Sequence, residues 1–493
     1  MKFAVVGGGI AGLAAAWEMI GPRPSSGGRT EEVPDLEVTV FEPAHLGGKL
    51  RTTSFLGRQV DEAPDSLITR VPDGVVLCQE LGLEDELVGS AANRAVLFSQ
   101  GKLQPLPEGL VLGVPSRLLP LVRSRILSPA GVARAALDAV LPTSSRGTDA
   151  SVFSLVASRF GPEVADRLVG PLLGTIHAAD TRQLSAAATA PQLLNAARTS
   201  RSLMSGLRRA SATGPAPAAG PLFVAPRQGM QSLADRLVER LGDAGARFLP
   251  VEASGLRRDG RSVVVEPTGE AFDGVVLATS APAALSLLEP LLGPSGPIPL
   301  ATLDFASVAV VTLAFGAEAF EVPADLSGVL VAPGSGLMMT ACSFGSNKWP
   351  HWAAPGSVVL RVSVGRSGEE TWARFDDEAL VERLCAELGT VLAGMGPAGL
   401  GPGARGRLGR GPEAPPVPVG WRVSRWPRSM PQYEVGHLER VALAKQTIAR
   451  QAPMVAVAGA SYGGVGVPSC IASGRRASRE LKAAARSLGL PTA

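Results

Sequence analysis

Short runs of consecutive apolar residues, several of them bordered by glycine, are the clearest pattern in this chain. Residues 3–6 form one run, which ends in three glycines and is followed at 10–19 by strong helix formers. Similar runs lie at 37–41, 246–251, 274–279 and 454–458. Such runs are typical of parallel strands that are buried on both faces. The pattern predicts an α/β sheet assembled from the start, the middle and the end of the chain.

The intervening segments follow two other patterns. Residues 115–210 are rich in alanine, leucine and arginine and are mainly helical in pattern, whereas 295–440 alternate as strands do, with one helix at about 376–392. We expect a flexible connection at 202–220 and a loop at 394–418, because both are rich in small residues and turn formers. Residues 110–127 are apolar with spaced arginines, and the helical segment expected there either packs internally or touches a membrane surface.

Composition narrows the class of protein. The 493 residues are 45% hydrophobic and 18% charged, which excludes global disorder. The net charge is only +3 and no basic stripe is visible, so nucleic-acid binding is not expected. The four cysteines lie far apart, which predicts neither a metal site nor a disulfide framework. Without a signal-peptide pattern or a transmembrane stretch, we expect a cytoplasmic protein, either free or peripheral to the inner face of the membrane.

A glycine motif follows the first predicted strand. Gly7, Gly9 and Gly12 fit the pattern G-x-G-x-x-G, in which the first glycine allows a tight turn. The second lets the backbone approach a pyrophosphate, and the third allows the helix to pack closely on the strand. The phosphates of a dinucleotide rest at the N-terminus of such a helix. The motif alone is weak support for a nucleotide site.

An acidic residue strengthens this interpretation. Glu42 ends the second predicted strand, where a carboxylate accepts hydrogen bonds from the hydroxyls of an unphosphorylated ribose. It lies 30 residues beyond Gly12 instead of about 20. We attribute the excess to a surface loop at 21–28, inserted between helix and strand. Glu42 is preferred to the acidic residues at 31–37 because those precede or start the strand.

Two further glycine segments favour FAD over NAD. Gly47, Gly48 and Lys49 follow the ribose acid directly, an arrangement typical of FAD folds. Near the C-terminus, a strand at 454–458 leads into a glycine-rich loop at 459–466 and then a helix. The N-terminus of that helix carries partial positive charge, which suits the electron-rich edge of a flavin ring.

Eight segments spread over nearly the whole chain carry a family resemblance. They are GGGIAGL at 7–13, LGGKLRT at 46–52, DEAPDS at 61–66, RLVGPLLGTIHAAD at 167–180, SNKWPH at 346–351, LRVSVGR at 360–366, RWPRSMPQYEVGHLER at 425–440 and GGVGVPSCIASG at 463–474. The sequence resembles the flavin-dependent porphyrinogen oxidases of haem biosynthesis, within the amine-oxidase-like FAD superfamily. Lys49 and the segments at 346–351 and 360–366 resemble the bacterial branch that acts on coproporphyrinogen III.

The resemblance implies an architecture and a set of boundaries. The expected fold is α/β, with a Rossmann-like FAD-binding domain, a mixed-sheet substrate domain and an inserted helical domain. We assign 1–70, 222–290 and 441–493 to the FAD-binding domain, and 71–114 with 291–440 to the substrate domain. Residues 115–221 form the helical domain with its flexible connection.

The resemblance also implies which residues bind. The implied FAD contacts are Gly7, Gly8, Gly9, Ile10, Ala11, Gly12, Glu42, Pro43, Gly48, Lys49, Ala63, Pro64, Asp65, Ser66, Val251, Trp426, Val465, Gly466 and Val467. Arg94 resembles an arginine that anchors a substrate carboxylate, although it is otherwise an ordinary surface cation. His177 either assists proton removal or lines the pocket, and no other residue is expected to be catalytic. Arg182 and Arg366 are further cations that the carboxylates of a tetrapyrrole would attract, and no metal is expected.

The implied reaction is the FAD-dependent, oxygen-linked, six-electron oxidation of coproporphyrinogen III to coproporphyrin III. The alternatives are oxidation of protoporphyrinogen IX, another flavin amine oxidase, or a chaperone with an FAD-type fold that no longer uses flavin. The implied partners are the porphyrinogen, molecular oxygen and, transiently, a ferrochelatase that receives the poorly soluble product.

Overall fold

The computed structural model describes residues 1–21, 36–141, 147–213, 220–292, 300–319, 322–393 and 416–487. The chain divides into two compact units. The first comprises Met1–Gly89, Ala218–Leu303 and Leu438–Ala493, and the second comprises Ser90–Pro217 and Asp304–His437. Each is built from segments that are distant in the sequence. The predicted helical domain lies almost wholly within the second unit and is not separated as a unit of its own. The division into a FAD-binding, a substrate and a helical domain therefore stays a prediction.

The centre of the first unit is a five-stranded parallel sheet in the order β12-β2-β1-β16-β22. Its strands are β1 (Lys2–Val6), β2 (Glu37–Phe41), β12 (Arg247–Leu249), β16 (Gly274–Leu277) and β22 (Val455–Val457). Nearly all residues of β1, β2, β16 and β22 are buried, whereas the edge strand β12 is exposed or half-buried. The predicted parallel sheet from the start, middle and end of the chain is therefore confirmed.

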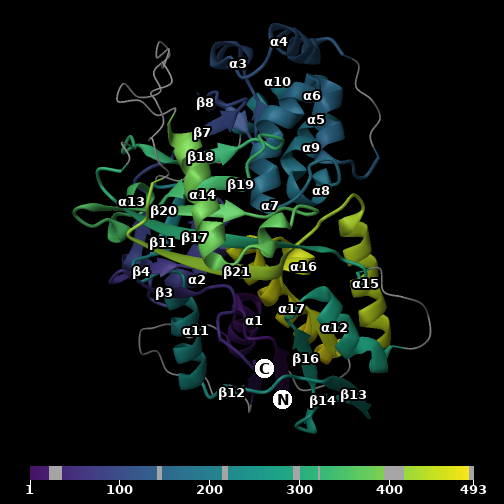
Figure 1. The fold of residues 1–493 in the computed structure, drawn as a ribbon. Helices are drawn as coiled ribbons and strands as arrows, with labels where there is room; N and C mark the ends of the chain where they lie inside the picture. Colours follow the sequence, from purple (N-terminus) through teal and green to yellow (C-terminus); the bar gives the residue numbers. More distant parts are fainter. Residues whose placement is uncertain are drawn as a thin grey trace. The chain divides into compact units, whose positions relative to one another are not determined.

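Helices of the first unit pack around this sheet (Figure 1). Helix α1 (Ile10–Ile20) and helix α17 (Val467–Ser487) cross so closely that a Cβ on Gly474 would lie 2.0 Å from the Ala11 carbonyl oxygen. The other elements are β3 (Thr52–Phe55), β4 (Arg58–Asp61), β5 (Leu67–Ile68), α2 (Asp73–Glu80), β6 (Leu87–Gly89), β11 (Phe223–Pro226), α11 (Gln231–Asp243), β13 (Gly255–Asp259), β14 (Ser262–Glu266), β15 (Glu270–Phe272), α12 (Ala281–Leu288), α15 (His437–Gln451) and α16 (Ala460–Gly463).

The second unit contains a seven-stranded mixed sheet in the order β21-β17-β20-β19-β18-β7-β8. Its strands are β7 (Arg94–Ser99), β8 (Lys102–Pro105), β17 (Phe305–Gly316), β18 (Leu326–Val331), β19 (Met339–Phe344), β20 (Ser357–Val364) and β21 (Gly420–Pro431). Helix α14 (Asp377–Leu392) lies across one face, and its apolar residues form a core with the strands. This confirms the strand alternation and the helix predicted between 295 and 440.

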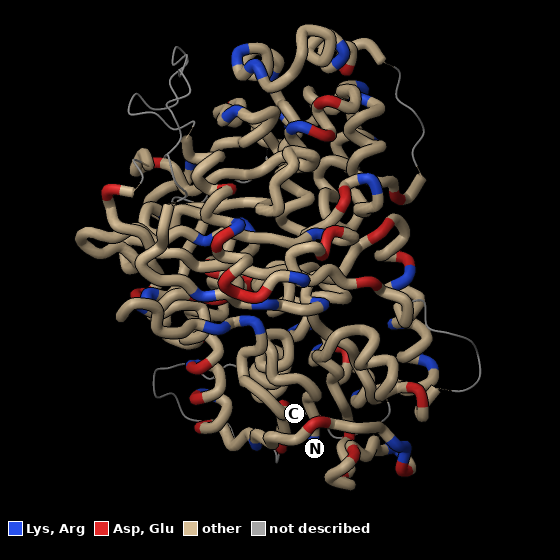
Figure 2. Tube along the Cα trace, in the orientation of Figure 1, with Lys and Arg blue, Asp and Glu red and all other residues tan. Residues whose placement is uncertain are grey.

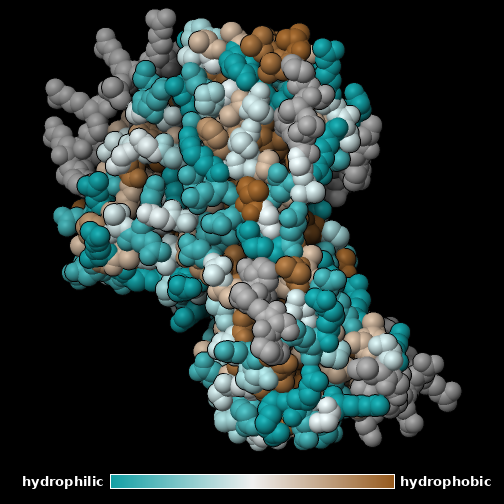
Figure 3. Space-filling view, turned by 90° about the vertical axis from the view of Figure 1, so that its right-hand side faces the viewer, coloured by the Kyte–Doolittle hydropathy of each residue, from teal (hydrophilic) through white to brown (hydrophobic). Residues whose placement is uncertain are grey.

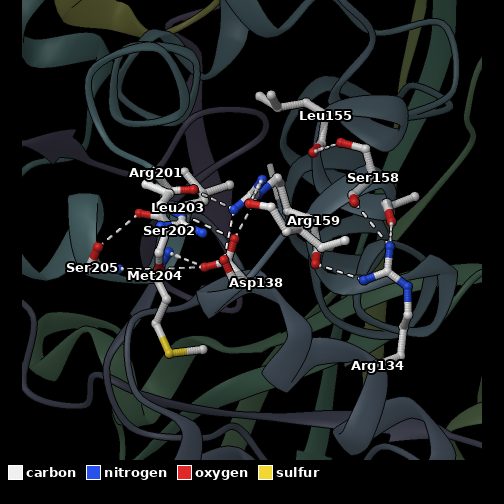
Figure 4. Close-up of polar contacts among 12 residues, drawn as sticks. Arg134, Asp138, Leu155, Ser158, Arg159, Arg201, Ser202, Leu203, Met204 and Ser205 are labelled. Atoms are coloured by element: carbon white, nitrogen blue, oxygen red, sulfur yellow. Dashed lines mark hydrogen bonds and ion pairs between the residues drawn. The ribbon is translucent and has the colours of Figure 1, made fainter. Parts of the chain in front are cut away.

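The remainder of the second unit is mainly helical. It contains β9 (Leu110–Val111), β10 (Val114–Pro115), α3 (Leu118–Ser124), α4 (Pro129–Ala136), α5 (Val152–Phe160), α6 (Pro162–Val164), a π-helix η3 (Ala165–Gly174), α7 (Thr175–His177), α8 (Ala186–Thr189), α9 (Pro191–Thr199), α10 (Leu203–Thr213) and α13 (Gly345–Lys348). A buried ion pair connects Asp138 to Arg159 of α5, with 2.7 Å between Oδ1 of Asp138 and Nε of Arg159 (Figure 4). The Asp138 carboxylate also accepts hydrogen bonds from the amides of Leu203 and Met204 at the start of α10.

Two expectations for this helical region are wrong in part. The segment expected to be a flexible connection at 202–220 is α-helical from Leu203 to Thr213, because Asp138 satisfies the free amides of its first turn. The segment expected to be helical at 110–127 forms two short strands before α3 begins at Leu118. Most of the loop expected at 394–418 lies outside the described residues. The same holds for the loop expected at 21–28, of which only residue 21 is described.

Charges are interspersed along the described trace, and Figure 2 shows no continuous basic stripe there. Within the described ranges, no helix is long and apolar enough to span a bilayer. Nor do the residues that the structure describes include a cluster of three or more histidine, cysteine or acidic side chains that could hold a metal ion.

Candidate functional site

In the glycine turn between β1 and α1, neighbouring backbone leaves no room for a side chain at Gly7 or Gly12, but it leaves room at Gly9. Gly7 has φ +104°, and a Cβ there would lie 3.0 Å from the backbone of Ala278. A Cβ on Gly12 would lie 1.9 Å from the Gly7 oxygen, so α1 packs directly on the turn. A Cβ on Gly9 would meet nothing within 4 Å. Gly7 and Gly12 are thus required by the protein itself, while Gly9 borders open space.

The open space lies at the N-terminus of α1. No side chain caps this end, and no acidic residue occupies the first turn. Free amides at a helix N-terminus carry partial positive charge and bind phosphate oxygens. The open side of Gly9 therefore fits the close approach of a pyrophosphate.

Glu42 lies beside the glycine turn at the end of β2. Its Oε2 accepts a hydrogen bond from the Gly8 amide at 2.8 Å, and its Oε1 accepts one from the Ala44 amide at 3.0 Å. These bonds fix the carboxylate, and each oxygen retains a lone pair that can accept a ribose hydroxyl. The position fits the predicted ribose-binding role of Glu42. Pro43, the next residue, is exposed.

The second glycine loop touches the first. Gly47 donates its amide to the Gly8 oxygen at 2.8 Å, and a Cβ on Gly48 would lie 3.1 Å from the Gly9 Cα. Lys49 follows and lies near Cys470 in the first turns of α17. Burial raises the pKa of the Cys470 thiol to about 11, while the Lys49 charge acts in the opposite direction. The thiol is therefore protonated near neutral pH.

The remaining predicted FAD contacts of the first unit lie in loops. Ala63, Pro64, Asp65 and Ser66 follow β4 and are half-buried, and the Ser66 hydroxyl donates to the Asp65 carboxylate at 3.0 Å. Val251 follows β12. The third glycine loop, with Val465 and Gly466, leads into α17, which begins at Val467. Because α17 packs on α1, this loop and the first glycine turn belong to one region of the unit.

Trp426 lies on β21 of the second unit, half-buried. Its contact with FAD therefore stays a prediction.

His177 ends the short helix α7 in the second unit. Its side chain is buried, its Nδ1 has no hydrogen-bond partner, and burial lowers its pKa to about 4. Its ring and the ring of Tyr433 are in an edge-type arrangement, with 6.1 Å between the ring centroids and 60° between the ring planes. His177 is therefore uncharged near neutral pH and is a weak base.

Arg94 begins β7 and is exposed. Its Nε and Nη2 donate to both oxygens of Asp325 at 2.6 and 2.9 Å, and this pairing raises the pKa of the guanidinium. Its charge is thus already balanced by a carboxylate. Its role as a substrate anchor stays a prediction.

A cavity of about 680 Å³ lies wholly within the second unit, and no pattern in the sequence predicted it. Arg182 and Arg366 both line it, whereas Arg94 and His177 do not. The two arginines are distant in the sequence, so spacing carried no information about their convergence. The one signal that sequence reasoning could have used is that both lie in or next to segments of the family resemblance.

Comparisons with known proteins show which family this chain resembles. The family model described as flavin containing amine oxidoreductase matches residues 10–482. The coproporphyrinogen III oxidase of Bacillus subtilis is 30% identical, over 96% of this chain and 96% of that protein. Protoporphyrinogen oxidase 1 of Arabidopsis thaliana is 26% identical, over 95% and 85% respectively.

Among solved structures, a protein of Exiguobacterium sp. 255-15, provisionally described as a protoporphyrinogen oxidase, superimposes with a TM-score of 0.80. It is 28% identical and covers 98% of this chain and 99% of its own. The expected Rossmann-like fold and FAD cofactor are confirmed, and the glycine turn, Glu42 and the open side of Gly9 fit that cofactor. This chain belongs to the flavin-containing amine oxidoreductase family.

Proposed function

We propose that this chain oxidises coproporphyrinogen III to coproporphyrin III, with FAD as cofactor and molecular oxygen as electron acceptor. The observation that carries this proposal is the end-to-end similarity to the coproporphyrinogen III oxidase of Bacillus subtilis. Support also comes from a first unit whose glycine turn and Glu42 suit an FAD dinucleotide.

The chemistry divides between cofactor and protein. Bound FAD supplies hydride acceptance from a methylene bridge of the porphyrinogen and transfer of the electrons to oxygen, three times in all. Glu42 holds the ribose, and the free amides of α1 hold the phosphates. The α17 N-terminus contributes partial positive charge to the same unit. None of these groups needs to act as a nucleophile.

Each oxidation also releases a proton from a pyrrole nitrogen, and His177 is the proposed acceptor. It is neutral near pH 7, which leaves Nδ1 free to accept a proton. Its low pKa makes it a weak base, so it contributes only if the proton passes on quickly to solvent. The competing role, in which His177 takes no part in proton removal, predicts unchanged turnover in His177→Gln.

The competing substrate is protoporphyrinogen IX, which the name of the Arabidopsis relative supports. Parallel assays of porphyrin fluorescence with the two porphyrinogens separate the readings. The proposal predicts a higher kcat/KM for coproporphyrinogen III, and a higher value for protoporphyrinogen IX would overturn the choice of substrate.

Two interactions complete the proposal. A ferrochelatase would receive the poorly soluble product by transient contact.

Peripheral binding to a membrane would use α3, where Leu119 and Val122 are 58% and 46% exposed beside Arg123 and Arg125. On the face shown in Figure 3, hydrophobic residues form small patches among hydrophilic residues. Flotation with anionic vesicles, with and without Leu119→Ser, tests this surface.

A further inference from the structure

The cavity of the second unit has a wall built by five segments. They are the turn between β7 and β8, the π-helix η3, the stretch from Ala179 to Arg182, the turn that follows β18 and the turn that follows β20. Most of its lining residues are polar or charged, and the charged ones are Asp166, Arg167, Asp180, Arg182, Arg366 and Glu369. A volume of about 680 Å³ is within the range of small-molecule sites, and the lining suits a polar group rather than an apolar ring.

Arg366 is the unusual member of this lining. It is only 9% exposed, yet its Nε has no hydrogen-bond partner. Its Nη2 donates to the Val331 carbonyl oxygen at 3.2 Å, and no ion pair to a described carboxylate accompanies it. Burial lowers the pKa of this guanidinium. A buried cation without a carboxylate partner is costly, and an anion in the cavity would remove that cost.

The other arginines of the cavity are already paired. Arg182 lies 2.8 Å from Asp166 and 3.8 Å from Asp180, and Arg167 lies 3.2 Å from Glu163. Glu369 influences Arg366 electrostatically, but its side chain is exposed and lies beyond ion-pair distance. Arg366 is therefore the cation in this lining whose charge the protein leaves unbalanced.

The backbone around Arg366 is held in place by conformations that cost free energy. The amide of Ser367 donates to the oxygen of Ala178, a non-glycine residue with φ +48°. Another part of the wall is the ten-residue π-helix, which contains Pro171. The π-helix is a rare conformation that often occurs at functional sites, and strained residues persist where the surrounding structure holds them in place. These features support a binding role for the cavity wall.

We propose that this cavity is a carboxylate-binding site in which Arg366 takes one carboxylate group of the tetrapyrrole. The inference rests on the proposed function for the identity of the ligand, because coproporphyrinogen III and its product carry four carboxylates. Of the three arginines that the sequence suggested, Arg94 and Arg182 are paired and exposed. Arg366 is buried, lines the cavity and lacks a partner for Nε.

The test compares Arg366→Met, Arg366→Lys and the matched control Arg374→Met, which replaces an exposed arginine of the same unit outside the cavity lining. Affinity for coproporphyrin III is measured by fluorescence titration of the FAD-loaded protein, and succinate serves as a small free carboxylate. We expect Arg366→Met to weaken coproporphyrin III binding about 10- to 100-fold, the range for a lost charge-assisted hydrogen bond. Arg366→Lys should recover part of the affinity, and Arg374→Met should bind as the parent does.

Two further readouts separate binding from structure. Without ligand, Arg366→Met should melt no lower than the parent, because it removes a buried unpaired charge. In turnover, its KM for coproporphyrinogen III should rise while kcat changes little. A lower melting temperature with unchanged coproporphyrin III binding would assign Arg366 a structural role and overturn the proposal.

The remaining outcomes also decide. Arg366-dependent stabilisation by succinate but not by coproporphyrin III would make this a site for small free acids, which overturns the tetrapyrrole assignment. Failure of the parent protein to oxidise coproporphyrinogen III would instead refute the proposed function. Unchanged coproporphyrin III binding in Arg366→Met, with an active parent, would refute only the role of Arg366.

Discussion

The buried pair of Asp138 and Arg159 gives the sharpest structural prediction. The two side chains are 1% and 4% exposed, and the Asp138 carboxylate accepts four hydrogen bonds. Their donors are Arg159, the Ser202 hydroxyl and the amides of Leu203 and Met204 (Figure 4). Asp138→Asn keeps the shape but removes the negative charge that faces the buried guanidinium of Arg159. Removing one partner of a buried pair costs about 3–5 kcal/mol, so we expect that loss in the free energy of unfolding of the second unit.

The double variant Asp138→Leu with Arg159→Met tests the cause. It removes both charges, so it should be less destabilised than the sum of the two single variants by about 2 kcal/mol or more. The assay is urea unfolding followed by circular dichroism, together with hydrogen exchange of peptides from α10. Because the Asp138 carboxylate accepts hydrogen bonds from two backbone amides of α10, Asp138→Asn should speed hydrogen exchange in α10 first. A variant within about 1 kcal/mol of the parent, with unchanged α10 exchange, would refute this reasoning.

Three further predictions concern the cofactor and pH. Gly9→Ala should fold and melt as the parent does, because the new Cβ meets no protein atom within 4 Å. It should bind FAD less tightly, because that Cβ enters the space of the ligand. Gly242→Ala, whose Cβ also meets no protein atom, is the matched control. Glu42→Gln should weaken FAD binding about 10-fold in a titration of flavin-free protein, since neutral acceptors bond less strongly than charged ones, and equal affinities would remove Glu42 from the ribose site. Burial lowers the pKa of His177 from 6.5 to about 4, so the unfolded chain takes up its proton first as the pH falls. The folded state should lose about 3 kcal/mol between pH 6.5 and 4, and His177→Gln should lack this part of the loss in paired acid-denaturation curves.

The nucleotide half of the fold could be predicted because its signals are local. A buried parallel strand appears in the sequence as a short apolar run, and the glycines at 7 and 12 are imposed by close contacts that no side chain allows. The position of Glu42 directly after a strand of the same sheet could also be predicted, whereas its binding of the ribose stays a prediction. These features needed no knowledge of contacts between distant segments.

The second unit was less predictable because its structure depends on such contacts. The composition of α10 suggested a flexible connection. Its helical structure could not be predicted, because Asp138, which accepts hydrogen bonds from its first amides, lies more than sixty residues earlier in the chain. Arg182 and Arg366 could be proposed as cations, but only the fold brings them to one cavity. The partner of Arg94 is equally distant in sequence, so the balance of its charge by Asp325 could not be anticipated.

The most direct test of the account is the product formed when air reaches an anaerobic mixture of the FAD-loaded protein and coproporphyrinogen III. Fluorescence of coproporphyrin III and hydrogen peroxide are followed together, with Glu42→Gln alongside. The account predicts no porphyrin before oxygen enters, then coproporphyrin III with three equivalents of peroxide per molecule. Porphyrin formation no faster than in a protein-free control, despite bound FAD, would contradict it.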